Sequence, residues 1–225
     1  QAGETRAEYA LASEAPTPVL IEQALACLAG HLPMRGLKAI GQRVVHGGDH
    51  FAGPALINDD VLAEIEALTS LAPLHQPKSV ALIHALRQLC PNVAQIACFD
   101  TAFHRTQPDL VRRFALPRVL FDAGVKRFGF HGLSYQFIAA ELERRRPDLA
   151  RSRIVAAHLG AGASICALEG GVSRDTTMGF STLDGVPMAT RCGATDPGVL
   201  IHLMRARNMS ADALEHMLYH ESGLL

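Results

Sequence analysis

The sequence has no excess of charge of either sign and no run that could lie in a membrane. Its 225 residues carry 21 Lys and Arg against 22 Asp and Glu, and the two signs are well mixed along the chain. A field that would attract nucleic acid or an anionic lipid surface is therefore not expected. No apolar run is long enough to cross a bilayer, and no signal peptide is recognised. We expect a cytoplasmic protein without nucleic-acid or membrane partners.

Cysteine is scarce, and a disulfide framework is not expected. The five cysteines are Cys27, Cys90, Cys98, Cys166 and Cys192. Their odd number, wide spacing and apolar surroundings favour reduced thiols, and no zinc-type pair occurs among them. The chain starts with Gln rather than Met, and no further strand pattern follows its last two helical segments. We therefore expect an internal piece of a longer protein.

Alternating apolar and amphipathic segments predict an α/β protein. Helices are expected at 18–30, 59–71, 78–90 and 132–146, and Asn58 can cap the second of them. Buried strands are expected at 37–45 and 92–100, and a polar loop is expected between the second strand and the helix at 132–146. The two strands end beside Arg43 and Asp100, and functional groups collect where the strands of a partly parallel sheet end. Consecutive strands are then expected at 153–160, 163–169 and 172–177, the last two joined as a hairpin. We place a domain boundary near residue 152.

A glycine hairpin, "HLGAGAS" at 158–164, joins two of these strands. Glycine lets backbone amides approach a ligand closely, as a phosphate-binding hairpin requires, although a simple tight turn has the same pattern. Four other segments place Arg, His or Asp beside glycine or proline: "RVVHGG", "CFDTAFH", "GFHGLS" and "TRCGATDPG". Together these groups suit phosphoryl transfer, in which neutralising negative charge provides most of the catalysis.

These four segments and "HLGAGASICALEGGVSRDTTMGFSTLDG" resemble the acetate and propionate kinase family in order and spacing, from about residue 36 to the end. The resemblance implies the duplicated ribonuclease-H-like α/β fold of actin, Hsp70 and sugar kinases, with the first domain and the start of the second present. It also implies reversible phosphoryl transfer between ATP and acetate with Mg²⁺, and a homodimer. Residues 1–152 would then be the remainder of an acetate-binding domain, and 153–225 the first part of a nucleotide-binding domain.

The same resemblance assigns site residues. The catalytic positions are matched by Asp100, His131 and Arg191. The acetate site is matched by Arg43 for the carboxylate, by Val45, Leu74 and Phe130 for the methyl group, and by His75. The ATP phosphate loop is matched by His158, Leu159, Gly160, Ala161 and Gly162. Because a carboxylate nucleophile is already ionised at neutral pH, we expect Asp100 to orient an arginine or the water shell of the metal rather than to act as a base.

The chain departs from the family pattern at three positions. Ala161 stands where most relatives carry Asn, Ala189 stands where glycine is frequent, and Thr182 stands where a proline commonly lines the methyl pocket. The opening strand with its serine-rich phosphate hairpin, the metal ligands and the adenine-binding segment are not recognised in this sequence.

Three alternative functions remain open. A propionate or butyrate kinase differs only in the acyl pocket, where one methylene is worth roughly 1–3 kcal/mol. A metal-dependent hydrolase could use Asp49 and Asp100 with four histidines, namely His46, His75, His104 and His131; no pair among these has the helical spacing of zinc sites. A binding module without activity is disfavoured, because it would have no need for two desolvated arginines in one cleft.

Overall fold

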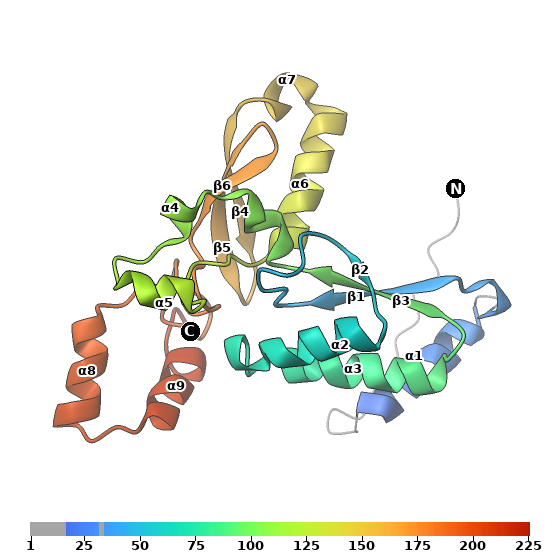
Figure 1. Cartoon of the computed structure of the whole chain (residues 1–225), viewed down its shortest axis with the longest axis horizontal. Coiled ribbons are helices and arrows are strands. Elements are labelled where there is room, and N and C mark those ends of the chain that lie inside the picture. The colour runs from blue at the N-terminus through green and yellow to red at the C-terminus, as the bar shows by residue number, and fades with distance from the viewer. Residues whose placement is uncertain (1–16, 32–33) are drawn as a thin grey trace.

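The computed structural model describes residues 17–31 and 34–225, and within them two three-stranded sheets are joined by helices (Figure 1). The first sheet contains β1 (Ala39–Val44), β2 (Ala55–Leu56) and β3 (Ala94–Phe99) in the order β1-β3-β2. Strands β1 and β3 are parallel, whereas β2 is antiparallel to β3. Since Val44 pairs with Phe99, both parallel strands end at the same edge of the sheet. The predicted strands at 37–45 and 92–100 are confirmed.

Three helices lie beside this sheet: α1 (Thr17–Ala29), α2 (Asp59–Ala67) and α3 (Gln76–Leu89) (Figure 1). Helix α2 begins as expected at Asn58, whose side-chain oxygen accepts the amide N–H of Val61 at 2.8 Å. Helix α3 begins two residues earlier than predicted. Pro77 lies in its first turn, where the missing amide N–H of proline costs no hydrogen bond. Short 3-10 segments occupy Met34–Gly36 and Leu68–Leu71.

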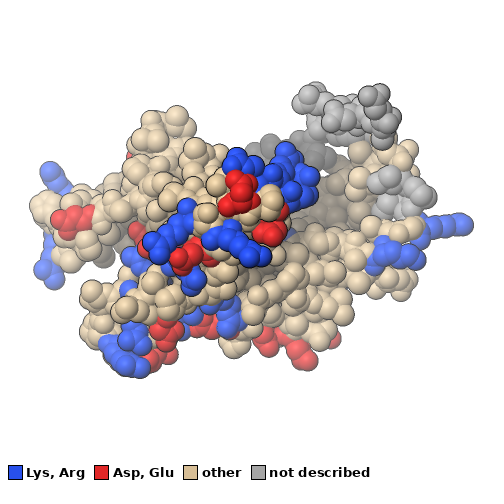
Figure 2. Space-filling view, turned by 90° about the horizontal axis from the view of Figure 1, so that it is seen from above, with Lys and Arg blue, Asp and Glu red and all other residues tan. Residues whose placement is uncertain are grey.

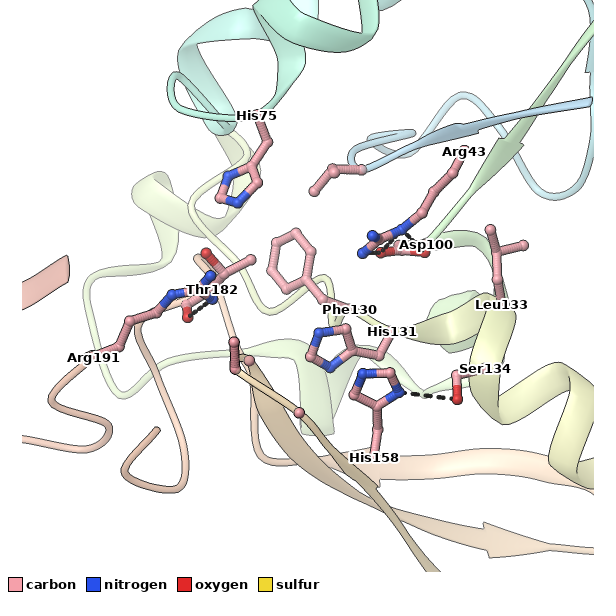
Figure 3. Close-up of a pocket in the computed structure, with 14 residues that line it drawn as sticks. Arg43, His75, Asp100, Phe130, His131, Leu133, Ser134, His158, Thr182 and Arg191 are labelled. Atoms are coloured by element: carbon pink, nitrogen blue, oxygen red, sulfur yellow. Dashed lines mark hydrogen bonds and ion pairs between the residues drawn. The ribbon is translucent and has the colours of Figure 1, made fainter. Parts of the chain in front are cut away.

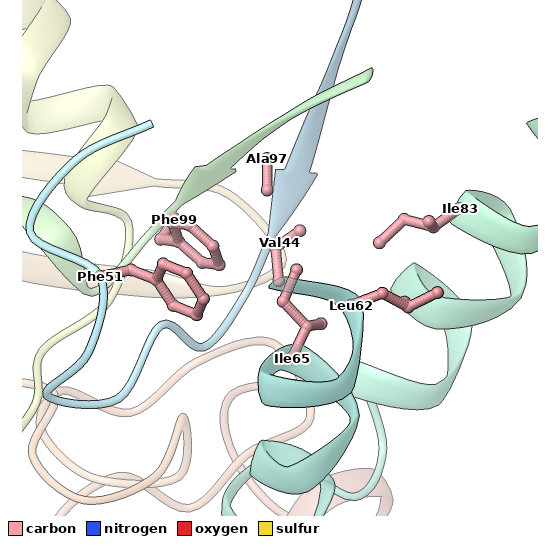
Figure 4. Close-up of a cluster of buried hydrophobic side chains, with 7 residues drawn as sticks. All are labelled: Val44, Phe51, Leu62, Ile65, Ile83, Ala97 and Phe99. Atoms are coloured by element: carbon pink, nitrogen blue, oxygen red, sulfur yellow. The ribbon is translucent and has the colours of Figure 1, made fainter. Parts of the chain in front are cut away.

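A cluster of buried apolar side chains fixes the first sheet on α2 and α3 (Figure 4). Its members are Val44, Phe51, Leu62, Ile65, Ile83, Ala97 and Phe99. The rings of Phe51 and Phe99 stack with their centroids 4.3 Å apart. Full burial of one such side chain stabilises the fold by about 1.5–3 kcal/mol, so this cluster holds the ends of β1 and β3 rigidly in place.

The segment between β3 and the next long helix is not the plain polar loop that the sequence pattern indicates. It contains a 3-10 helix, η3 (Ala102–Thr106), and two short helices, α4 (Asp109–Arg112) and α5 (Arg118–Asp122). Asp49, from the loop after β1, accepts hydrogen bonds from both Arg112 and Lys126 at 2.5 Å. These side-chain pairs connect segments far apart in the sequence, which is why local periodicity does not predict them.

The second sheet is an antiparallel meander of β4 (Arg153–Leu159), β5 (Ala163–Glu169) and β6 (Val172–Thr176), as predicted. Gly170 and Gly171 form the turn between β5 and β6 with positive φ angles of 59° and 75°. Helix α6 (Gly132–Arg145), followed by the short α7 (Pro147–Ala150), covers this sheet (Figure 1). Its Tyr135 packs with Ala156 and Cys166 in a buried cluster. A boundary near residue 152 stays a prediction.

The last helices, α8 (Pro197–Ala206) and α9 (Ala211–His220), form an arm, and the chain after α9 returns to the loop around Arg191 (Figure 1). The Thr190 hydroxyl donates to the carbonyl of Tyr219 at 2.8 Å, and the amide of Cys192 donates to the carbonyl of Leu218 at 3.2 Å. These contacts fix the backbone on either side of Arg191. The structure therefore holds this arginine from two directions.

The charged side chains on the surface agree with the balanced numbers of basic and acidic residues in the sequence. Positive and negative side chains are interspersed over the face shown in Figure 2, so no broad field of one sign covers it. All five cysteines are free, as expected. Within residues 17–31 and 34–225, no helix is both long and apolar enough to span a membrane.

Replacing Gly132 by alanine is expected to destabilise the fold by about 3 kcal/mol. A Cβ atom there would lie 2.0 Å from the carbonyl oxygen of Asp100 and 2.9 Å from Cβ of Phe103, so the backbone would have to move. Urea unfolding measures the change. Gly41→Ala is the control, because a Cβ at Gly41 meets no atom within 4 Å. Equal stability of the two variants would contradict the prediction.

Candidate active site

A pocket of about 430 Å³ lies where the edge of the first sheet meets the β4–β5 hairpin (Figure 3). Its walls come from the ends of β1 and β3, the start of α6, the hairpin and the loop around Arg191. The lining residues are Arg43, Val45, His75, Asp100, Phe130, His131, Leu133, Ser134, His158, Gly160, Ala161, Gly162, Thr182 and Arg191. The pocket therefore brings together all three residues expected to be catalytic.

Two residues expected at the site lie outside the pocket. Leu159 is 78% exposed, because successive side chains of a strand point to opposite faces and His158 already faces the pocket. Leu74 is 36% exposed and does not line the cavity, whereas its neighbour His75 does. Leu133 and Ser134 are lining residues that the sequence analysis missed. They follow His131 in the first turn of α6, and this adjacency is the signal that could have found them.

Arg43 and Asp100 form a two-pronged ion pair across the ends of β1 and β3 (Figure 3). Nε of Arg43 donates to Oδ2 of Asp100 at 3.0 Å, and Nη2 donates to the same oxygen at 2.5 Å. These hydrogen bonds raise the pKa of Arg43. The Asp100 side chain is 2% exposed, but that of Arg43 is 59% exposed. The expectation of two desolvated arginines is therefore wrong for Arg43, which offers its remaining N–H groups to the open pocket.

His131 stands at the N-terminus of α6 in a left-handed conformation, with φ at 58°. Its ring stacks on that of His158 with a centroid distance of 4.0 Å, and Nδ1 of His158 lies 3.0 Å from the hydroxyl of Ser134. Burial, His158 and the nearby arginines lower the pKa of His131 to about 4. At neutral pH the ring is uncharged and can donate only one hydrogen bond.

The hairpin of residues 160–162 passes directly in front of His131 and Arg191. A Cβ atom built at Gly162 would lie 3.4 Å from Nε2 of His131 and 3.5 Å from Nη1 of Arg191. The absence of a side chain thus leaves space for a ligand between the imidazole, the guanidinium and the backbone. Within the described residues, no hydrogen bond from the amides of Gly160 or Ala161 is found, so these groups are free to bind an anion.

A backbone carbonyl and an aromatic ring hold Arg191, and neither neutralises the charge that it presents to the pocket. Nη1 donates to the carbonyl of Thr182 at 3.2 Å (Figure 3), and the guanidinium lies over the Tyr219 ring, 5.9 Å from its centre. No carboxylate pairs with Arg191 in the part of the chain that the structure describes. Its charge also contributes, after burial, to a lowered pKa of His75.

His104 and His46 lie behind the pocket rather than in it. His104 is 1% exposed; its Nε2 lies 2.9 Å from the carbonyl of Phe130 and its Nδ1 lies 2.8 Å from the hydroxyl of Ser173. A carbonyl only accepts, so Nε2 carries the proton and holds the loop that precedes His131. Gln76 binds both the amide and the carbonyl of His46, which ties α3 to the end of β1. Both histidines therefore support the position of site residues.

An apolar wall closes one side of the pocket. Val45 and Phe130, expected for the methyl group, are 8% and 1% exposed and pack with Met178 and Met188. Thr182 lines the same cavity, and its hydroxyl is buried without a hydrogen-bond partner. A small apolar group between the ion pair and this wall would be excluded from water.

Among residues 17–31 and 34–225, no group of three or more His, Cys, Asp or Glu side chains is placed to hold a metal ion. A metal-dependent hydrolase would need such a group of ligands, so the structure does not support this alternative. His216 and His220 have the i, i+4 spacing on α9, but they lie outside the histidines considered for that function. Asp100 is the one carboxylate among the described pocket residues.

The two sheets meet at a cationic, glycine-lined pocket, and this arrangement defines an α/β protein whose pocket suits an anionic ligand. Residues 19–225 match the model of the acetokinase family. The chain belongs to this family.

Comparison with curated relatives agrees. Acetate kinase of Methylocella silvestris is 49% identical over 204 residues, which cover 91% of this chain and 50% of that protein. Acetate kinase of Rhodopseudomonas palustris is 50% identical over 213 residues, covering 91% of this chain and 52% of that protein. The chain thus spans about half the length of the curated relatives it matches.

Solved structures of the family share the fold. The acetate kinase of Porphyromonas gingivalis matches with a TM-score of 0.84 and 35% identity, over 92% of this chain and 53% of that chain. A propionate kinase from Francisella tularensis matches with a TM-score of 0.87 and 35% identity, over 92% of this chain and 54% of that chain. The ribonuclease-H-like fold class expected from the sequence is confirmed.

Acidification is expected to destabilise this fold between pH 6.5 and pH 4. Burial lowers the pKa of His46, His104 and His131 to about 4 in the folded chain, against an ordinary value near 6.5. The unfolded chain binds protons first, so the stability contributed by these neutral rings is complete above pH 6.5 and is lost as the pH falls toward 4. Urea unfolding at intervals between pH 7 and pH 4 measures this loss; a constant free energy of unfolding would contradict it.

Proposed function

We propose that this protein is an acetate kinase, which transfers the γ-phosphoryl group of ATP to acetate and catalyses the reverse reaction. The observation that carries the proposal is the placement of Arg191, without a carboxylate partner in the described residues, across Gly162 from His131. Phosphoryl transfer depends chiefly on positioning the reactants and neutralising charge on the equatorial oxygens. Family membership supports the same reaction.

Arg43 would bind the acetate carboxylate. Asp100 takes two of the five N–H hydrogens of its guanidinium, which leaves three for a ligand. Because Asp100 is buried and holds Nε and Nη2, the plane of the guanidinium is fixed before acetate arrives. This agrees with the expectation that Asp100 orients an arginine. In this role Asp100 is a positioning residue, and no proton needs to leave the acetate, which is already ionised.

His131 and Arg191 would then stabilise the group in transit. A carboxylate oxygen of acetate attacks the γ-phosphorus, the bond from that phosphorus to the bridging oxygen of ADP breaks, and ADP leaves with the electron pair. Arg191 offsets charge on the equatorial oxygens, and neutral His131 donates a hydrogen bond to one of them. Both side chains face the space left by Gly162.

The hairpin of residues 158–162 supports binding of the ATP phosphates, through exposed backbone amides and the charge of Arg191. Mg²⁺ is commonly held by one or two carboxylates together with substrate phosphates. Asp100 is the residue here that would hold a water of its shell, and the ion would neutralise phosphate charge. The proposal also includes a cytoplasmic location, a domain boundary near residue 152 and a homodimer. Membership of the acetokinase family is the support for these three points.

The first test is trapping of acyl phosphate by hydroxylamine with magnesium-ATP and acetate. Arg191→Ala is expected to lower kcat/KM at least about 100-fold, because it removes charge stabilisation needed most in the transition state. Arg174→Ala is the matched control, since Arg174 lies on β6 and pairs with Glu169 at 3.1 Å, outside the pocket. Equal activity of both variants would contradict the proposal.

Acyl selectivity is expected to depend on Val45. Its side chain lies in the apolar wall with Phe130, so Val45→Ala leaves room for a longer acyl chain. One methylene is worth roughly 1–3 kcal/mol, and we therefore expect the propionate-to-acetate ratio of kcat/KM to rise about 10-fold. Val155→Ala, at a position that is 74% exposed, serves as the control. An unchanged ratio in Val45→Ala would remove Val45 from the acyl pocket.

A further inference from the structure

Two buried hydroxyl groups lie directly behind His131, on the side away from the pocket. Tyr135, in the first turn of α6, and Ser164, in β5, are both 0% exposed, and neither lines the cavity. The phenolic oxygen of Tyr135 lies 2.6 Å from Oγ of Ser164, and that oxygen lies 2.8 Å from Nδ1 of His131. The three groups form a continuous hydrogen-bonded chain that ends on the imidazole.

The direction of this chain follows from counting hydrogens. Ser164 Oγ is the one hydrogen-bond partner of the Tyr135 hydroxyl among the described residues. If Ser164 donated to Tyr135, the phenolic hydrogen would be buried without an acceptor, which costs about 1–3 kcal/mol. Every hydrogen has an acceptor only when Tyr135 donates to Ser164 and Ser164 donates to Nδ1 of His131. Nδ1 then carries no proton.

We propose that Tyr135 and Ser164 are positioning residues that hold His131 in the tautomer with its proton on Nε2, directed toward Gly162 and Arg191. Two observations agree with this direction. The stack on His158 fixes the plane of the ring, and a Cβ at Gly162 would lie closest to Nε2 rather than to Nδ1. The ring is neutral, since burial and the arginines lower its pKa to about 4, so the tautomer decides which nitrogen can donate.

The inference rests on the proposed function for its catalytic consequence only. With the proton on Nε2, His131 donates to a phosphoryl oxygen that gains charge in the transition state. With the proton on Nδ1, Nε2 presents a lone pair to the same oxygen and repels it. Without the two hydroxyl groups both tautomers become populated, and only part of the protein can donate.

Nitrogen NMR of ¹⁵N-histidine-labelled chain tests the tautomer directly. The two ring nitrogens have distinct shifts when protonated and unprotonated, and the signals of His131 are identified by their loss in His131→Gln. We expect the wild type to carry its proton on Nε2, and Ser164→Ala to show a mixture of tautomers. Tyr135→Phe, which keeps the ring and its packing, is expected to shift the signals in the same direction.

Ser173→Ala is the matched control. Ser173 is also a buried serine of the second sheet, but its hydroxyl contacts His104 instead of His131. This variant should leave the tautomer of His131 unchanged. A wild-type proton on Nδ1, or Ser164→Ala and Tyr135→Phe spectra that match the wild type, would overturn the proposal.

Kinetics separate this inference from the proposed function. In an active protein, Ser164→Ala is expected to lower kcat about 10-fold with little change in KM, because binding precedes the step that needs the donor. A variant with normal tautomer and reduced kcat would overturn the positioning role. An Nε2 proton in the wild type, together with equal activity of Arg191→Ala and Arg174→Ala, would contradict the proposed function and leave the tautomer assignment supported.

Discussion

The close approach of Gly132 to Asp100 is the constraint on which the site depends. The amide of Gly132 donates to the carbonyl of Asp100 at 2.9 Å, at a distance that no larger residue could reach. This contact brings the N-terminus of α6 to the edge of the first sheet. Because α6 also packs on β4 and β5, the same contact places the glycine hairpin of the second sheet opposite the ends of β1 and β3. The pocket exists because the backbone at Gly132 can contact the backbone at Asp100.

Neutral histidines make up much of the framework around this contact. Nε2 of His104 donates to the carbonyl of Phe130, Nδ1 of His46 accepts the amide of Gly48, and Nδ1 of His131 lies 2.8 Å from the hydroxyl of Ser164. Burial is the main cause that lowers the pKa of each ring to about 4, so each stays uncharged at neutral pH. These three rings therefore add no positive charge beside the arginines, whose charge a phosphate or a carboxylate would need.

The two arginines have different surroundings, and this difference matches the roles proposed for them. Arg43 is paired with a buried carboxylate, which fixes its geometry but reduces its net charge. Arg191 is held by a carbonyl and an aromatic ring, which leave its charge in place. An acetate ion needs orientation, whereas a phosphoryl group in transit needs neutralisation. The structure provides one arginine of fixed orientation, Arg43, and one arginine whose charge is not compensated by a carboxylate of the described residues, Arg191.

The sequence by itself determined the order of the elements, because alternation and helical periodicity are local properties. It predicted the parallel strands ending at Arg43 and Asp100, the cap at Asn58 and the β4–β5–β6 meander, and motif resemblance indicated most of the pocket residues. Tertiary structure alone decided that Leu159 faces outward, that Arg43 stays exposed, and that Tyr135 and Ser164 meet His131. These outcomes depend on contacts between segments distant in the chain, which no local pattern encodes.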